Sequence, residues 1–251
     1  MSSPTLVIVP GSFGPAKMYD VFVETLNRHD IKSVVISTPS VGRKQNRPPA
    51  TMSDDAEEIS NVVSKLLDQG DQVVMMTHSY GGIPGTQSLK TISRKAREAE
   101  GKQGGVDKII YLTSMVLQPG MSNFEAFGGA MPDFLTVEDD YMSLDVQVNS
   151  TLTFSDLTAE KALEEAKQME DHSTASFKEK LTYPGYNDVE VHYIVCEEDK
   201  VIPPVFQRGM IEGIKASSGR DVTVHTLDSG HVPTTSQPEN TTRIIEKVLK
   251  A

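Results

Sequence analysis

Short runs of β-branched and aliphatic residues alternate with stretches of helical spacing along most of the chain. Such runs are typical of buried strands, and apolar residues three and four positions apart are typical of helices. The runs predict strands at 5–10, 31–37, 72–77, 106–114, 189–196 and 221–227. The spacing predicts helices at 16–27, 53–68, 83–98, 159–169, 205–214 and 237–250, the second of them capped by Ser53. This alternation indicates an α/β fold with a mostly parallel twisted sheet and helices on both faces.

The alternation stops between residues 116 and 186, after the fourth predicted strand. This segment contains helical pieces and is enriched in Met and Phe, namely Met121, Phe124, Phe127, Met131, Phe134 and Met142. The chain shows no internal repeat and no low-complexity linker. We therefore expect one domain over residues 1–251, with a helical lid inserted at about 116–186.

Composition limits the class of protein and of partner. The 251 residues are 37% hydrophobic and 24% charged, which is ordinary for a globular domain of this size. A formal net charge of -11 would repel nucleic acid and anionic membranes, so neither is an expected partner. Cys196 is the only cysteine, which excludes an intramolecular disulfide. The first residues carry no pattern of a signal peptide, and we expect a cytoplasmic protein.

The first candidate for chemistry is Ser79, in the segment THSYGG at 77–82. It follows a predicted buried strand and opens a predicted helix, the context of a nucleophile elbow. Gly81 and Gly82 would let that helix pack closely behind the turn. Thr77 differs from the Gly usual at the start of this pattern, and a Ser in this place can also be an ordinary helix cap.

Two further loops, each just past a predicted strand, hold an acid and a histidine. The first is EEDKVIP at 197–203, and the second is DSGH at 228–231, ending in His231. The first could simply be a solvated acidic loop, and the histidine of the second could simply cap a helix. Together with Ser79, however, they give the order Ser, acid, His at the carboxyl ends of parallel strands, which is the order of a hydrolase triad.

These residues and their surroundings resemble the α/β-hydrolase superfamily, in particular the branch of plant methylesterases, hydroxynitrile lyases and fungal homologues. The resemblance covers nearly the whole chain, through VPGSFGPAKMYD, MTHSYGG, LTYPGYNDVEVHYIVCEEDKVIPPVFQ and SGHVPTTSQPE. It implies an α/β-hydrolase fold with Ser79 as nucleophile and His231 as base. It also implies that the orienting acid is Asp199 rather than Glu197 or Glu198.

The same resemblance implies an oxyanion hole made by the backbone N–H groups of Ser12 and Tyr80. Pro10 replaces a His that relatives often carry in the first loop, and Phe13 is the neighbouring candidate for lining the pocket. Because the inserted segment covers the site in this fold, we also expect Phe124 and Phe134 to contact substrate. The pocket would then be apolar.

These expectations favour a serine hydrolase acting on a small to medium apolar carboxylic ester or lactone, with no cofactor and no metal. Hydroxynitrile lyases usually carry Lys after the catalytic His and Thr in the first loop, where this chain has Val232 and Ser12. Cyanohydrin cleavage is therefore disfavoured. A cyclase or carbon–carbon lyase using the same triad, or a ligand receptor with weak turnover, stays open, and the sequence gives no indication of oligomeric state.

Two other histidines are not expected to act in catalysis. His78 precedes the candidate nucleophile, and we expect a structural residue that points away from the pocket. His172 stands beside Glu170 and Asp171, and without a second histidine at ligand spacing we expect it on a solvated face of the lid rather than at a metal.

Overall fold

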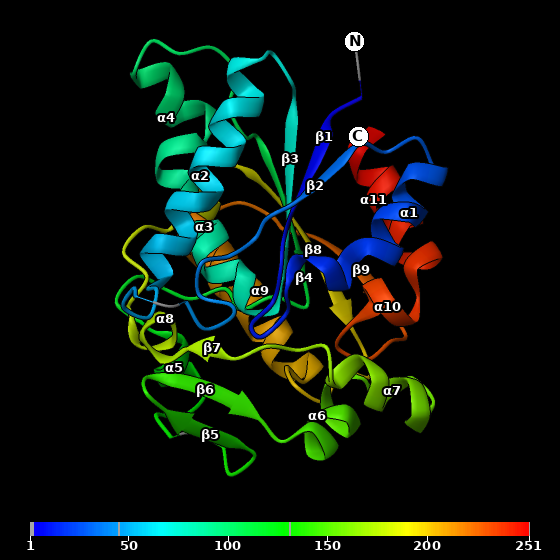
Figure 1. Cartoon of the computed structure of the whole chain (residues 1–251). Coiled ribbons are helices and arrows are strands. Elements are labelled where there is room, and N and C mark those ends of the chain that lie inside the picture. Colours follow the sequence, from blue (N-terminus) through cyan, green and yellow to red (C-terminus); the bar gives the residue numbers. More distant parts are fainter. Residues whose placement is uncertain (1–2, 45, 131, 251) are drawn as a thin grey trace.

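The computed structural model, which describes residues 3–44, 46–130 and 132–250, contains a six-stranded sheet in the order β2-β1-β3-β4-β8-β9 (Figure 1). Every neighbouring pair in this sheet is parallel. The strands are β1 Thr5–Val9, β2 Ser33–Val35, β3 Val73–His78, β4 Lys108–Leu112, β8 Glu190–Cys196 and β9 Thr223–Leu227. Five lie within the segments that the apolar runs predict, and β3 extends one residue beyond its predicted segment, to His78.

Helices cover the sheet on both faces, as the alternation predicts. The helices α1 (Asp20–Arg28) and α11 (Pro238–Lys250) pack on one face, and α2 (Met52–Asp68), α3 (Gly82–Ile92) and α9 (Pro204–Ser218) pack on the other. Side chains of one strand alternate between the two faces because the side-chain period of a strand is two residues. In β1, for example, Val7 and Val9 contribute to one core, while Leu6 and Ile8 contribute to the other.

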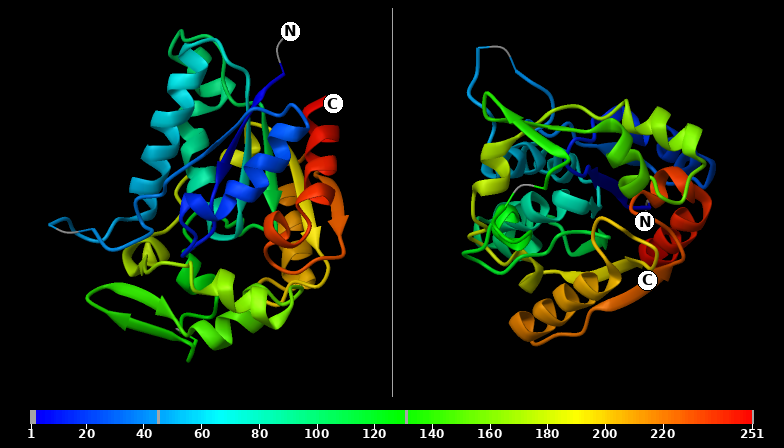
Figure 2. Two further views of the ribbon diagram at one scale, coloured as in Figure 1. Left: turned by 45° about the vertical axis from the view of Figure 1, so that its right-hand side comes forward. Right: turned by 90° about the horizontal axis from the view of Figure 1, so that it is seen from below.

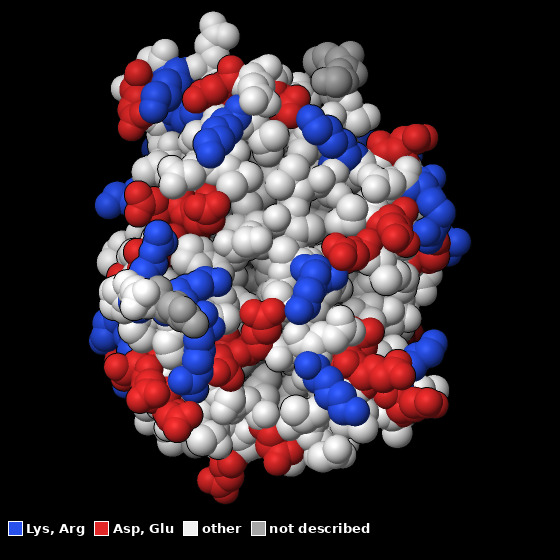
Figure 3. Space-filling model, in the orientation of Figure 1, with Lys and Arg blue, Asp and Glu red and all other residues white. Residues whose placement is uncertain are grey.

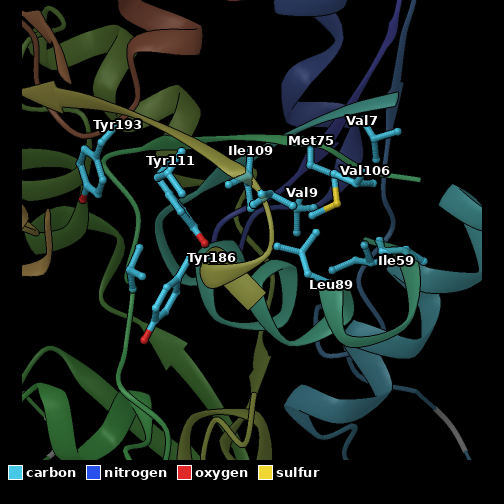
Figure 4. Close-up of a cluster of buried hydrophobic side chains, with 14 of the residues drawn as sticks. Val7, Val9, Ile59, Met75, Leu89, Val106, Ile109, Tyr111, Tyr186 and Tyr193 are labelled. Carbon is cyan, nitrogen blue, oxygen red and sulfur yellow. The ribbon is translucent and has the colours of Figure 1, made fainter. Parts of the chain in front are cut away.

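The core under α2 and α3 is continuous along the sheet (Figure 4). Its buried side chains come from β1, β3, β4 and β8 as well as the helices, and three of them are the tyrosines Tyr111, Tyr186 and Tyr193. The hydroxyl of Tyr193 donates to the carbonyl oxygen of Ser114 at 2.7 Å. The core therefore holds the backbone just beyond β4, which borders the candidate site.

Two helix boundaries differ from those that the sequence predicts. Thr51, not Ser53, caps α2, because the Thr51 hydroxyl accepts from the Asp54 N–H and the Asp54 carboxylate accepts from the Thr51 N–H. The predicted helix 83–98 is two helices, α3 and α4 (Arg94–Ala99), separated at Ser93. Ser93 is extended at this break and caps α4 with its side chain.

The segment between β4 and β8, residues 113–189, is the inserted segment. Figures 1 and 2 show it as a layer across one end of the sheet, formed by chain from the middle of the sequence. Its elements are α5 Asn123–Ala126, β5 Leu135–Glu138, β6 Tyr141–Leu144, α6 Val146–Thr153, α7 Ala159–Ala166, β7 His172–Ser173, α8 Thr174–Lys178 and the 3₁₀ turn η3 Gly185–Asn187.

The inserted segment contains the expected helices and, in addition, a small sheet that was not expected. The strands β5, β6 and β7 form a three-stranded antiparallel sheet. The β5–β6 connection is Asp139-Asp140, and both residues have positive φ. Asp and Asn tolerate this conformation in tight hairpin turns, but the strands themselves are only two to four residues long, too short to show a period of two.

The surface carries charges of both signs. On the face shown in Figure 3, acidic and basic side chains are interspersed. Three salt bridges of Arg43, to Glu138, Asp139 and Asp171, tie the loop after β2 to the inserted segment. None of the helices in the described ranges combines the length and the apolar character needed to cross a bilayer.

Candidate active site

Ser79 lies at the turn between β3 and α3, in a short 3₁₀ turn η2 (Ser79–Gly81). Its φ is 51°, a conformation that non-glycine residues rarely adopt and that costs about 1–3 kcal/mol. Gly81 and Gly82 make the turn possible. A Cβ on Gly81 would lie 2.4 Å from the carbonyl oxygen of Pro10, and one on Gly82 would lie 2.3 Å from that of Met115. The sequence therefore builds a sharp strand-turn-helix around Ser79.

This close packing gives a testable prediction. Gly82→Ala should lower the free energy of unfolding by about 3 kcal/mol or more, because the new methyl group meets backbone rather than a movable side-chain end. The matched control is Gly209→Ala on exposed α9, where a Cβ meets open space. It should stabilise by about 0.5–1 kcal/mol through helix propensity. Urea unfolding of both variants measures the difference, and equal effects would contradict the packing argument.

The three residues named from the sequence come together at the carboxyl ends of β3, β8 and β9. His231 Nε2 lies 2.9 Å from Ser79 Oγ, and His231 Nδ1 lies 2.7 Å from Asp199 Oδ2. All three residues are buried. Because an ionised carboxylate only accepts hydrogen bonds, Nδ1 carries the ring proton and Nε2 is left to accept from the Ser79 hydroxyl.

Asp199 is held as a carboxylate. Burial alone would raise its pKa, but the electrostatic attraction and hydrogen bond of His231, with hydrogen bonds from Thr113 and the Ile202 N–H, hold the pKa below its usual value. The Val201 and Ile202 N–H groups donate to Oδ1 at 2.7 and 2.9 Å. The neighbouring acid Glu197 instead pairs with Arg208 at the surface. Asp199, rather than Glu197 or Glu198, is therefore the acid that contacts His231.

The two residues expected to supply oxyanion donors, Ser12 and Tyr80, both lie on the wall of the cavity beside Ser79. The next N–H along the first loop, that of Phe13, is already used, since it donates to His172 Nδ1 at 3.3 Å. Tyr80 is held from the opposite side, where its hydroxyl donates to Asp55 at 2.7 Å. Burial raises the pKa of Asp55 to about 6, although hydrogen bonds from Ser40 and Tyr80 oppose this.

His78 is one of the residues that line the cavity, and both nitrogens of its ring are used in hydrogen bonds within the protein, as expected of a structural residue. Its Nε2 donates to the His231 carbonyl oxygen at 2.8 Å, so Nδ1 is the acceptor and accepts a hydrogen bond from the Tyr19 hydroxyl at 2.8 Å. Tyr19 in turn accepts from the Gly11 N–H at 3.2 Å. Burial, followed by the proximity of His231, lowers the pKa of His78 to about 3. This neutral ring thus ties the His231 backbone to the loop that carries Ser12.

His172 is completely buried, so its expected place on a solvated face is wrong. Its ring packs among Phe13, Tyr80 and Phe177, and its Nε2 lies 2.9 Å from the Ser176 hydroxyl. Its acidic neighbours Glu170 and Asp171 instead form salt bridges with Lys17 and Arg43. Within the described ranges, no group of three or more His, Cys, Asp or Glu side chains is placed to hold a metal ion.

The neutral state of His172 gives a prediction about pH. Burial lowers its pKa to about 3, whereas an unfolded histidine titrates near 6.5. Between about pH 6 and 4 the unfolded chain therefore binds a proton at this residue that the folded chain does not, and stability falls as the pH falls.

The variant His172→Asn keeps an acceptor, Oδ1, for the Phe13 N–H but has no ring to protonate. Its free energy of unfolding should therefore fall less steeply with falling pH, by about 1.4 kcal/mol per pH unit, which corresponds to one proton. Denaturant unfolding of both proteins over this range measures the slopes. Identical slopes would mean that folded His172 takes up its proton at an ordinary pH.

The cavity beside Ser79 has a volume of about 290 Å³ and is mostly apolar. Phe13, Phe124 and Phe134 all lie on its wall, and Phe127 lies there too. Of the other residues in the Met- and Phe-rich stretch, Met142 packs into a core, Met121 is partly exposed, and Met131 lies outside the described residues. Several wall residues carried no signal in the sequence: Met18, Asn123, Leu144, Asn149, Phe154, Met169, Phe177 and Lys200.

Comparison with known proteins identifies the family of the chain. The model of a family described as "Alpha/beta hydrolase family" matches residues 6–244, nearly the whole chain. The chain belongs to the alpha/beta hydrolase family. The resemblance noted from the sequence and the fold class are both confirmed.

Individual proteins of known sequence or structure are similar to the chain over most of its length. It is 34% identical over 249 residues to "Probable hydrolase R7" of a Phoma species, covering 99% of each chain. It is 26% identical over 223 residues to "Methylesterase 9" of Arabidopsis thaliana, covering 80% of this chain and 78% of the relative. A pyrethroid hydrolase of Sphingobium faniae has the same fold, with a TM-score of 0.75 and 17% identity over 100% of this chain and 98% of that one. The relatives include hydrolases and a plant methylesterase, which supports a hydrolase.

Proposed function

We propose that this alpha/beta hydrolase is a serine hydrolase that cleaves a small to medium apolar carboxylic ester or lactone. The observation that carries the proposal is the hydrogen-bonded series Ser79–His231–Asp199 beside an apolar cavity of about 290 Å³. The series supplies a nucleophile with an oriented base, and the cavity would exclude water from the reacting carbonyl group. The names of the fungal hydrolase and the plant methylesterase support the same reaction class.

In the proposed reaction, the Ser79 hydroxyl attacks the acyl carbon while His231 Nε2 takes its proton. Asp199 keeps the proton on Nδ1 and stabilises the imidazolium that forms. The N–H groups of Ser12 and Tyr80 stabilise the tetrahedral oxyanion, and each such donor is typically worth about 10²–10³ in rate. His231 then protonates the leaving alkoxide, and a second cycle with water releases the acid and restores Ser79.

We also propose that residues 116–186 act as a lid on a single domain and set the size of the substrate. Phe124→Ala or Phe134→Ala should then raise KM for long-chain esters several-fold more than for acetates, because a buried aromatic ring stabilises apolar ligand by about 1–3 kcal/mol. Steady-state kinetics with p-nitrophenyl esters from acetate to decanoate measures this. Val137→Ala on the exposed β5–β6 hairpin serves as control. Equal effects on short and long esters would count against the proposed pocket.

The experiment that tests the proposed function is turnover of the same ester series by the wild type and by Ser79→Ala. Turnover that disappears in Ser79→Ala supports a serine hydrolase. Ester turnover that persists in this variant would contradict the proposal. An activated Ser79 with no turnover of any ester would instead favour the cyclase, lyase or receptor alternatives.

A further inference from the structure

The loop that carries His231 contacts the inserted segment through a carboxylate. Asp156 lies in the turn between α6 and α7. Its Oδ2 accepts from the Gly230 N–H at 2.8 Å and from the Ser236 hydroxyl at 2.6 Å. Figure 1 shows α6 and α7 beside α10 (Pro233–Ser236), the helix that follows this loop. A residue of the inserted segment therefore holds the backbone immediately before His231.

The close approach of Asp156 requires a glycine at position 230. A Cβ on Gly230 would lie 2.6 Å from Oδ1 and 2.9 Å from Cγ of Asp156. Gly230 is not among the residues with positive φ, so space rather than backbone conformation requires glycine here. A larger residue would separate the carboxylate from the N–H group that it accepts from. The Gly-His pair of this loop is therefore shaped to receive the side chain of Asp156.

The backbone on both sides of His231 is held in place. Its carbonyl oxygen accepts from His78 Nε2 at 2.8 Å, a contact from the sheet, and the Gly230 N–H before it is held from the inserted segment. The ring must reach Ser79 Oγ at 2.9 Å and Asp199 Oδ2 at 2.7 Å at the same time. A displacement of about 1 Å at a reacting group can cost about 10²-fold in rate, so these backbone contacts bear directly on catalysis.

We propose that Asp156 is a positioning residue for His231, so that the inserted segment supports the catalytic base as well as covering the cavity. The inference rests on the proposed function, because it takes His231 as the base that accepts the Ser79 proton. Asp156 is not among the residues that line the cavity, so it acts through the Gly230 N–H and not on the substrate. Its loss should therefore lower kcat and leave KM nearly unchanged.

The first test compares Asp156→Ala with Asp156→Asn by steady-state kinetics on the best p-nitrophenyl ester. Asp156→Ala should lower kcat by about 10- to 100-fold and change KM by less than about twofold. Asp156→Asn keeps an oxygen acceptor for the Gly230 N–H and should retain kcat within about threefold of the wild type. An unchanged kcat in Asp156→Ala, or an equal loss in both variants, would overturn the inference.

Two control variants separate this contact from a general loosening of the inserted segment. Asp145 is an aspartate of the same segment, but its Oδ1 accepts from the Val148 N–H at 2.9 Å and caps α6. Ser236→Ala removes the other donor to Asp156 Oδ2 and leaves the Gly230 N–H in contact. Asp145→Ala and Ser236→Ala should both keep kcat within about threefold of the wild type. A loss in Asp145→Ala as large as that in Asp156→Ala would overturn the inference.

Gly230→Ala tests the same contact from the other side and leaves the carboxylate in the protein. Its methyl group would meet Asp156 Oδ1, so kcat should fall by about tenfold or more while KM changes little. This variant decides the matter if Asp156→Ala does not fold. A Gly230→Ala protein with the kcat of the wild type would overturn the inference.

The rate of Ser79 labelling by a fluorophosphonate separates this inference from the proposed function, because labelling needs the base but no ester turnover. Asp156→Ala should be labelled about 10- to 100-fold more slowly than the wild type, and Asp156→Asn at nearly the wild-type rate. That result would support the inference even if the wild type hydrolysed no ester. Ester turnover that depends on Ser79 but is unchanged in Asp156→Ala would remove the inference and leave the proposed function standing. Equal labelling rates of Asp156→Ala and the wild type would overturn the inference too.

Discussion

Replacing His231 with alanine is expected to reduce kcat for ester hydrolysis by about 10⁶-fold, which is the scale seen when the base of a serine triad is removed. His231 Nε2 is the atom within hydrogen-bond reach of Ser79 Oγ, at 2.9 Å. Without it, a hydroxyl of ordinary acidity must attack unaided. The measurement is steady-state and single-turnover kinetics on the best p-nitrophenyl ester.

The matched control for His231→Ala is His225→Ala. His225 is a partly exposed histidine on β9, and its Nε2 lies 3.1 Å from His192 Nδ1 rather than near Ser79. Its replacement should change kcat by less than about threefold, as expected for a site outside the chemistry. A His231→Ala protein that folds and keeps more than a tenth of wild-type kcat would show that another group serves as base.

Asp199→Asn is expected to lower kcat by about 10⁴-fold with little change in the fold. An amide can present its N–H to His231 Nδ1, which would move the ring proton to Nε2 and turn that atom from acceptor to donor toward Ser79. The loss should appear in kcat more than in KM, because Asp199 does not line the cavity. Kinetics on the same ester measures both constants.

The loop itself provides the controls for Asp199→Asn. Glu197→Gln and Glu198→Gln remove the two neighbouring carboxylates, one of which pairs with Arg208 at the surface. Each should keep kcat within about threefold of the wild type, since neither carboxylate contacts His231. A loss in Glu198→Gln comparable with that in Asp199→Asn would mean that the carboxylate was assigned to the wrong residue.

The sheet and the grouping of the candidate site could be predicted from the sequence because both follow from local patterns. Strands buried on both faces appear as continuous apolar runs, as in TLVIV of β1 and EVHYIVC of β8. Parallel strands bring their carboxyl ends to one edge, so residues just past β3, β8 and β9 had to meet there. The contacts of Ser79, His231 and Asp199 agree with that argument.

The inserted segment could not be predicted in the same way. The pairing of β6 with β7 joins segments about thirty residues apart. His172 is buried by Phe13 and Tyr80, which are distant in sequence. The Tyr19–His78–His231 hydrogen bonds and the contact of Asp156 with Gly230 depend likewise on the tertiary structure. Residues of this kind can be identified only from the folded structure.

The central claim is that Ser79 is an activated nucleophile. Its most direct test is the intact mass of the wild type and of Ser79→Ala after treatment with a fluorophosphonate. We predict one equivalent of label on the wild type, lost in Ser79→Ala, because His231 can accept the Ser79 proton as the phosphorus–oxygen bond forms. An unlabelled wild-type protein, or equal labelling of Ser79→Ala, would contradict the account.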